Sequence, residues 1–160
     1  MTVRAILDTS AVIAYASVDR AIPVAEFVQS VMEENEAIGA DPDDLEAFAE
    51  ISQVGIPTST FLAAYAYTDS FGRNLLSDLA ADLALAEELN DIERSTFVLL
   101  PLATVGAVLE ASELERRWPG RGEAIHHAMR LNAELATFDP PKTPLPRLGF
   151  TDLSATWDEA

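Results

Sequence analysis

The 160-residue chain is predicted to be a single α/β domain with a mostly parallel central sheet of about five strands flanked by helices. Short apolar runs alternate with longer stretches of helical periodicity, a pattern typical of parallel strands joined by right-handed helical crossovers. The length suits one hydrophobic core, and the absence of cysteine excludes disulfide and thiolate metal sites. We expect the domain to span residues 1–153, followed by an acidic tail over residues 154–160.

The charge balance limits the classes of partner. A net charge of −17 at pH 7 argues against general electrostatic attraction to nucleic acid, so any contact with RNA must be local. No stretch approaches the roughly 20 apolar residues of a membrane span, and the N-terminus lacks the apolar core of a secretory signal. The abundance of alanine and of arginine over lysine suggests a bacterial source. We therefore expect a soluble, cytoplasmic protein without membrane contact.

The first predicted strand ends in a carboxylate. Residues 4–7 form an apolar run that leads into Asp8, Thr9 and Ser10 and then into a helical pattern over residues 11–15. In an open parallel sheet, ligands bind outside the carboxyl ends of the strands, so Asp8 is a candidate for chemistry. Alternatively, one of these three polar side chains serves only as the N-cap of the helix.

The remaining elements continue the alternation. A second helix begins near Pro23, since proline is favoured in the first turn of a helix. Residues 33–50 hold eight acids and no base, which favours a solvated loop with a short helix. Further along, the predicted elements are a strand at 54–58, a helix at 61–68 capped by Ser59 or Thr60, a helix at 73–90, a strand at 96–100, helices at 104–118 and 123–131, and strands at 134–138 and 148–153.

Two carboxylates follow two predicted strands, Asp8 after the first and Asp139 after the strand at 134–138. The carboxyl ends of parallel strands share one edge of the sheet, so these side chains are expected to lie within several ångströms of each other. Two such carboxylates repel unless a cation lies between them, and oxygen ligands suit Mg²⁺ or Mn²⁺. A cation there would polarise a phosphate and activate water, which predicts metal-assisted phosphodiester hydrolysis.

Several motifs together resemble one family. Residues 6–15 resemble the opening motif of PIN domains, particularly the toxin nucleases of bacterial VapBC toxin–antitoxin pairs, and residues 135–140 resemble the family's later Thr-x-Asp strand. Ile-Pro at 56–57, Leu-Leu-Pro-Leu at 99–102 and His-Ala at 127–128 follow the family order. The resemblance implies a PIN-like three-layer fold, a Mg²⁺- or Mn²⁺-dependent ribonuclease, a homodimer, and inhibition by a small antitoxin.

The resemblance also implies which residues hold the metal. Asp8 and Asp139 match two of the family's metal carboxylates. A third family acid opens the helix before the last motif; it matches Glu123, or Gly122 if the histidine motif sets the register differently.

One family carboxylate has no counterpart. The family places a glutamate on the helix after the second strand, where this sequence has Ala63 and Ala64. Loss of a ligand weakens metal binding and removes a group that orients water, so we expect weakened nuclease activity. Asp69, further along the same predicted helix, would substitute only if the helix end bends inward.

The remaining polar candidates each have two interpretations. Ser10 resembles a hydroxyl that supports the metal site but is equally a helix cap, and Thr137 either orients Asp139 or packs as an ordinary strand residue. His126 or His127 could transfer protons near pH 7 or be structural. An arginine group either steers RNA phosphates or pairs with glutamates along a helix; it comprises Arg116, Arg117, Arg121 and Arg130.

Three functions follow. The first is a metal-dependent ribonuclease that uses Asp8, Glu123 and Asp139, with Ser10 and Thr137 in support. The second is an inactive PIN-like protein that serves as a protein-binding or regulatory module. The third is a haloacid-dehalogenase-like phosphotransferase, which also has a nucleophilic aspartate after its first strand but would need an acid in place of Ser10.

Overall fold

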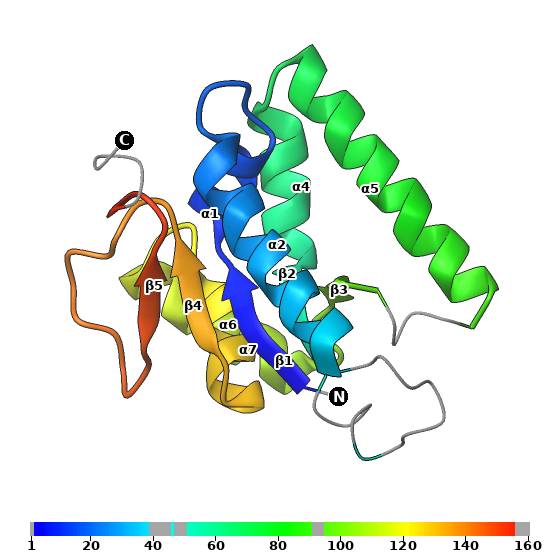
Figure 1. Cartoon of the computed structure of the whole chain (residues 1–160). Coiled ribbons are helices and arrows are strands. Elements are labelled where there is room, and N and C mark those ends of the chain that lie inside the picture. The colour runs from blue at the N-terminus through cyan, green and yellow to red at the C-terminus, as the bar shows by residue number, and fades with distance from the viewer. Residues whose placement is uncertain (1, 39–45, 47–50, 91–94, 156–160) are drawn as a thin grey trace.

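The structure is a computed structural model that describes residues 2–38, 46, 51–90 and 95–155. Over these residues the chain forms five strands and six helices (Figure 1). The strands are β1 (Thr2–Leu7), β2 (Ser52–Pro57), β3 (Phe97–Leu100), β4 (Glu134–Thr137) and β5 (Phe150–Asp152). The helices are α1 (Thr9–Tyr15), α2 (Ala21–Ile38), α4 (Thr58–Tyr67), α5 (Ser70–Glu88), α6 (Val105–Arg117) and α7 (Gly122–Leu131).

The five strands form one sheet in the order β3-β2-β1-β4-β5, and every pair is parallel. The prediction of an α/β fold with a parallel sheet of about five strands is confirmed. The chain first builds β1, β2 and β3 toward one edge and then returns to add β4 and β5 on the other side of β1. The switch point of this sheet therefore lies between β1 and β4, where ligands bind in open α/β sheets.

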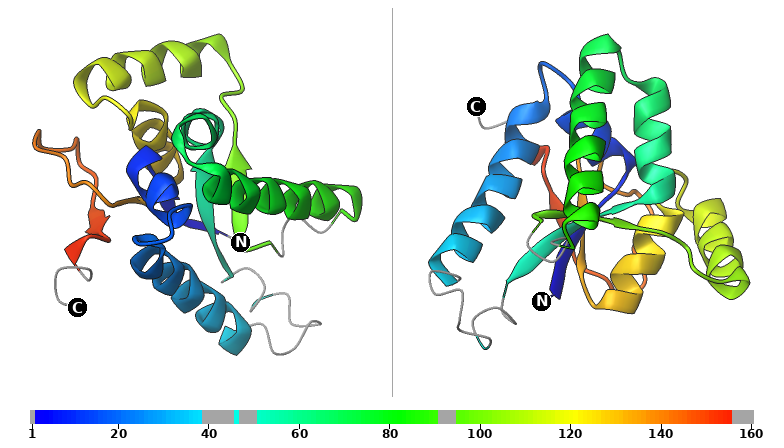
Figure 2. Two further views of the ribbon diagram at one scale, coloured as in Figure 1. Left: turned by 90° about the horizontal axis from the view of Figure 1, so that it is seen from above. Right: turned by 90° about the vertical axis from the view of Figure 1, so that its right-hand side faces the viewer.

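Helices cover both faces of the sheet and make three layers, as expected for a PIN-like fold. Helices α1, α2, α4 and α5 lie on one face, while α6 and α7 lie behind the other (Figures 1 and 2). Successive side chains of β1 alternate between these layers. Ala5 and Leu7 belong to the core under α1, α2, α4 and α5, whereas Ile6 packs with Ile125 of α7.

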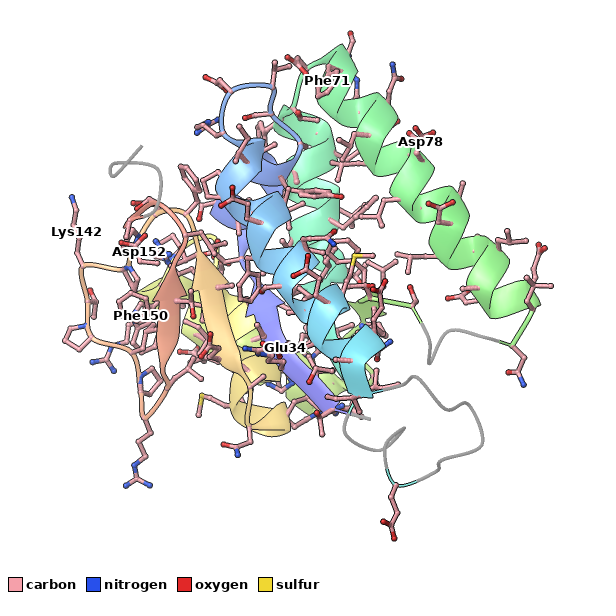
Figure 3. All side chains as sticks on the ribbon, in the orientation of Figure 1. Glu34, Phe71, Asp78, Lys142, Phe150 and Asp152 are labelled. Carbon is pink, nitrogen blue, oxygen red and sulfur yellow. The ribbon has the colours of Figure 1, made fainter. Side chains whose placement is uncertain are left out.

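The outer helix α5 begins earlier than the apolar pattern indicates, because Asp69 caps it. The Asp69 carboxylate accepts the backbone N–H of Gly72 at 2.9 Å, and α5 starts at Ser70. Phe71 and Asp78 both lie on this helix (Figure 3). Asp69 is thus engaged as a helix cap at the turn between α4 and α5.

Two other element boundaries differ from the sequence predictions. Helix α4 begins directly after Pro57 with no side-chain cap, so the predicted Ser59 or Thr60 cap is wrong. Helix α2 continues to Ile38 through residues expected to begin a loop, because glutamate, methionine and alanine favour helix. Residues 39–45 and 47–50 of the acidic segment lie outside the described residues, as do residues 156–160 of the tail.

Within the described part, no helix is both long and apolar enough to cross a membrane.

Candidate functional site

Asp8 lies at the carboxyl end of β1 and is also the N-cap of α1, so both interpretations of its position hold. Its side chain is only 1% exposed. Oδ1 accepts the backbone N–H of Ala11 at 3.0 Å and the hydroxyl of Ser10 at 2.7 Å. The strand therefore delivers a buried carboxylate to the switch point of the sheet, and the first turn of α1 holds it there.

The second oxygen of Asp8 bonds to an arginine from the turn between α6 and α7. Arg121 donates from Nη1 to Asp8 Oδ2 at 2.9 Å and to Thr137 Oγ1 at 3.0 Å. The same Nη1 lies 2.6 Å from the main-chain oxygen of Asp139, and Nη2 lies 3.7 Å from the Asp139 carboxylate. A single guanidinium thus contacts the ends of β1 and β4. We call this group of side chains the strand-end site: Asp8, Ser10, Arg121, Thr137 and Asp139.

Ser10 and Thr137 connect the two strand ends. The Ser10 hydroxyl donates to Asp8 and accepts the backbone N–H groups of Phe138 at 3.0 Å and Asp139 at 3.1 Å. Thr137 Oγ1 lies 3.1 Å from the Ser10 hydroxyl and donates to the main-chain oxygen of Asp139 at 3.0 Å. The two hydroxyls therefore fix the chain after β4 against the start of α1.

Burial and hydrogen bonding act on Asp8 in opposite directions. Burial raises the pKa of Asp8, because an ionised carboxylate loses its hydration there. Hydrogen bonds from Ser10, Thr137 and the Ala11 N–H, together with the Arg121 charge, oppose this rise, but the net shift is upward. Desolvation thus outweighs the nearby positive charge.

No family model matches this sequence, and no curated protein matches it. The resemblance to PIN domains therefore rests on the order of the motifs and on a fold of the expected class. The chemistry of the strand-end site has to be judged from its own geometry.

Glu123 points to the start of α4. It lies in the first turn of α7 and is 7% exposed. Oε2 accepts the backbone N–H of Ser59 at 3.1 Å, and Oε1 lies 3.2 Å from Nε2 of His127. Burial alone would raise the pKa of Glu123, but the hydrogen bonds from His127 and Ser59 outweigh it and lower that pKa. Both oxygens of the carboxylate are thus engaged, Oε2 in holding α7 against α4 and Oε1 with His127 one turn along α7.

An open hollow of about 280 Å³ adjoins Glu123 between α4 and α6. Ser59 and Ser112 contribute hydroxyls to its wall, and Glu115 contributes a second carboxylate. The Glu115 carboxylate also accepts the backbone N–H groups of Gly120 and Gly122, which flank Arg121 in the chain. Glu115 therefore shapes the turn that carries Arg121.

The side chains present do not form a ligand set for a divalent metal as they stand. Asp8 gives one oxygen to Arg121 and the other to Ser10 and Ala11, Glu123 is engaged elsewhere, and the Asp139 side chain is 80% exposed. Among the residues described, no three histidine, aspartate or glutamate side chains lie close enough to hold a metal ion. The predicted Mg²⁺ or Mn²⁺ site therefore lacks a third carboxylate near Asp8 and Asp139.

The positions that lack the family glutamate differ in burial. Ala64 of α4 is fully buried in the core, whereas its neighbour Ala63 is half-buried. Neither supplies an oxygen. Asp69, the other acid considered for this role, caps α5 through Gly72.

The two histidines of α7 are buried in different contacts. His127 faces Glu123, and its Nδ1 has no hydrogen-bond partner among the residues that the structure describes. His126 Nδ1 lies 3.2 Å from a Glu110 carboxylate oxygen of α6 without forming a hydrogen bond. Both residues therefore sit at helix contacts and not among the side chains of the strand-end site.

The four arginines divide between the two predicted roles. Arg116 pairs with Glu113 on exposed α6, Arg117 lies over the ring of Trp118, and Arg130 is exposed in the last turn of α7. Only Arg121 reaches a buried acid, over 113 residues of sequence. Its setting between Gly120 and Gly122 is the sequence signal for a tight turn, but the sequence does not reveal its partner.

Proposed function

We propose that this chain is a PIN-like protein that no longer performs metal-dependent hydrolysis and acts as a protein-binding or regulatory module. The observation that carries the proposal is the ion pair between Asp8 and Arg121, at 2.9 Å with side chains 1% and 12% exposed. A guanidinium fills the place next to the strand-end carboxylate where a nuclease of this family would be expected to hold its cation.

The other acids support the same conclusion. Both oxygens of Glu123 are engaged, one with Ser59 of α4 and the other with His127 of α7, and the glutamate expected on α4 is replaced by Ala63 and Ala64. A metal nuclease needs several oxygen ligands around the cation and an orienting group for water. With Arg121 beside Asp8 and with Ala63 and Ala64 on α4, neither requirement is met.

The surface favours a binding role. Several large apolar side chains are exposed on the helices of both layers, and each is more than half exposed. They are Ile22 of α2, Leu62 and Tyr67 of α4, Phe71 and Leu85 of α5 with its C-cap Leu89, and Val105 and Leu109 of α6. Leu85 and Leu89 lie one helical turn apart, as do Val105 and Leu109, so each pair presents neighbouring apolar side chains of the kind found at protein contact surfaces.

A weak VapC-like ribonuclease is the second candidate. It is favoured by the position of Asp8 and Asp139 at neighbouring strand ends, where both carboxylates approach one cationic group at 2.9 and 3.7 Å. On this proposal the site would take Mg²⁺ or Mn²⁺ and cut RNA. A small antitoxin and a second copy of the chain would then be its protein partners.

The two candidates are distinguished by Mn²⁺ binding, measured by titration calorimetry on the wild type and on Asp8→Asn. Asparagine retains an acceptor for the Ala11 N–H, so the start of α1 is preserved. We expect no binding heat that depends on Asp8 at millimolar Mn²⁺, and no RNA cleavage above that of the variant. Heat that is lost in Asp8→Asn, accompanied by cleavage that is also lost, would establish the ribonuclease instead.

A further inference from the structure

We propose that Arg121 is the residue that keeps divalent cations out of the strand-end site, and that removing its charge allows Mn²⁺ to bind between Asp8 and Asp139. The inference rests on the proposed function, which holds that the wild type binds no metal here. It goes further by assigning the absence of metal binding to the Arg121 side chain and not to the missing glutamate of α4.

Arg121 contacts the oxygens that a metal would need. Its partners are carboxylate oxygens of Asp8 at 2.9 Å and Asp139 at 3.7 Å, the Thr137 hydroxyl at 3.0 Å and the main-chain oxygen of Asp139 at 2.6 Å. Carboxylate, carbonyl and hydroxyl oxygens are the hard ligands that Mg²⁺ and Mn²⁺ prefer. A guanidinium and a divalent cation therefore compete for one set of acceptors.

The two cations cannot share that set. Like charges a few ångströms apart repel strongly where water is scarce, and the Arg121 side chain is only 12% exposed. Arginine does not lose its proton in proteins, so no change of pH relieves the repulsion. Because Arg121 belongs to the same chain, it is always present at the site, whereas a metal ion must be drawn from solution.

The turn that carries Arg121 is held in place independently of Asp8. Glu115 of α6 accepts the N–H groups on both sides of it, from Gly120 and from Gly122. The main-chain oxygen of Arg121 accepts the N–H of Ile125 at 2.8 Å in the first turn of α7. Substitution of the Arg121 side chain is therefore expected to remove the charge while the turn and the acceptors stay in position.

The missing glutamate of α4 is the weaker explanation. Mg²⁺ and Mn²⁺ often bind through one or two carboxylates and keep several waters. Asp8 and Asp139 with the Asp139 carbonyl would suffice for weak binding once the guanidinium is gone. Loss of a further ligand lowers the affinity, but a fixed positive charge prevents binding.

The test measures Mn²⁺ binding by electron paramagnetic resonance of the free ion, with four purified proteins whose folding is checked by circular dichroism. They are the wild type, Arg121→Gln, Arg121→Lys and the double variant Asp8→Asn/Arg121→Gln. We expect Arg121→Gln to bind Mn²⁺ at least about tenfold more tightly than the wild type. Arg121→Lys keeps the charge and should resemble the wild type, and the double variant should lose the gained binding.

The possible results separate the proposed function from the role of Arg121. Asp8-dependent Mn²⁺ binding by the wild type itself contradicts the proposed function. A folded Arg121→Gln protein that binds no better than the wild type overturns the role of Arg121 and leaves the proposed function standing. If Arg121→Gln is unfolded without metal, Mn²⁺ should refold it by replacing the lost counter-charge of Asp8. A chain that stays unfolded in millimolar Mn²⁺ also overturns the inference.

Discussion

The carboxylate of Glu123 lies over the start of α4 and accepts the backbone N–H of Ser59 at 3.1 Å. This bond satisfies one of the N–H groups that a helix leaves unpaired in its first turn, in a helix that has no side-chain cap of its own. An acid at the start of one helix therefore replaces the missing cap of another.

Replacing Glu123 with glutamine should lower stability by about 1–2 kcal/mol at pH 7, because hydrogen bonds to a charged acceptor are lost. The pKa of Glu123 lies below its ordinary value of 4.5, so its stabilising effect is present above that pH and is lost as the pH falls. Urea unfolding at pH 7 and near pH 3 should show the gap between wild type and variant closing in acid. A difference in unfolding free energy that stays constant across this range would mean that the charge of Glu123 does not contribute to stability.

Asp8→Ala should destabilise the protein by about 3–5 kcal/mol, because it leaves a nearly buried guanidinium without its partner and removes the N-cap of α1. Asp8→Asn also removes the charge that pairs with Arg121 but keeps an acceptor for the Ala11 N–H, so it should cost about 0.5–2 kcal/mol less than alanine. Chemical unfolding followed by circular dichroism measures both. Equal costs would mean that the cap bond to Ala11 contributes nothing, and costs near zero in both variants would mean the same of the Arg121 contact.

The pH dependence of Asp8 should have the opposite sign from that of Glu123. Burial raises the pKa of Asp8 above its ordinary value of 3.8, so its contribution to stability is largest below that pH and falls as the pH rises through the folded-state pKa. Asparagine does not titrate. The stability gap between wild type and Asp8→Asn should therefore narrow as the pH rises above 3.8; a widening gap would show that Arg121 outweighs burial.

Ala64→Glu should lower stability by at least about 3 kcal/mol, because it places an unpaired carboxylate in a fully buried position. Ala63→Glu, one residue earlier and half-buried, is the matched control and should cost much less. Thermal unfolding of both variants checks this. Similar melting temperatures would mean that α4 can rotate to expose residue 64, so that a carboxylate could be introduced there.

Gly122→Ala tests how closely α7 approaches α6. A Cβ at this position would lie 2.5 Å from the Glu115 nitrogen and 2.6 Å from the Ala111 oxygen, both main-chain atoms. We expect a loss of about 1–3 kcal/mol from this overlap. Gly106→Ala in α6 meets only the Thr104 hydroxyl at 3.9 Å and should be neutral or stabilising by about 0.5–1 kcal/mol. A tolerated Gly122→Ala would contradict the close packing.

The fold was largely predictable because its signals are local. Apolar runs and helical periods marked all five strands of the sheet, and the position of Asp8 after β1 followed directly from that pattern. Helix starts were less certain: the Asp69 cap moved α5 forward, and α4 began at Thr58 without using Ser59 or Thr60 as a cap. Such starts depend on which of several neighbouring polar groups bonds to the backbone.

The pairing within the site was not predictable in the same way. Placing Asp8 and Asp139 at neighbouring strand ends needed only parallel topology, and the structure agrees with it. That Arg121 reaches Asp8, and that Glu123 turns to Ser59, depends on the angle of the turn between α6 and α7. Glu115 and two glycines set this angle through main-chain contacts that no periodicity in the sequence encodes.

The strand order has a consequence for the synthesis of the protein. β1 is made before the other strands of the sheet and lies in its middle, yet one of its two neighbours, β4, is made only after β2 and β3. The acid at its tip, Asp8, also lacks its partner for most of this time, since Arg121 follows 113 residues later. A nascent chain that stops before α7 would hold a central strand with one open edge and an unpaired carboxylate, so truncated products should not persist as folded protein.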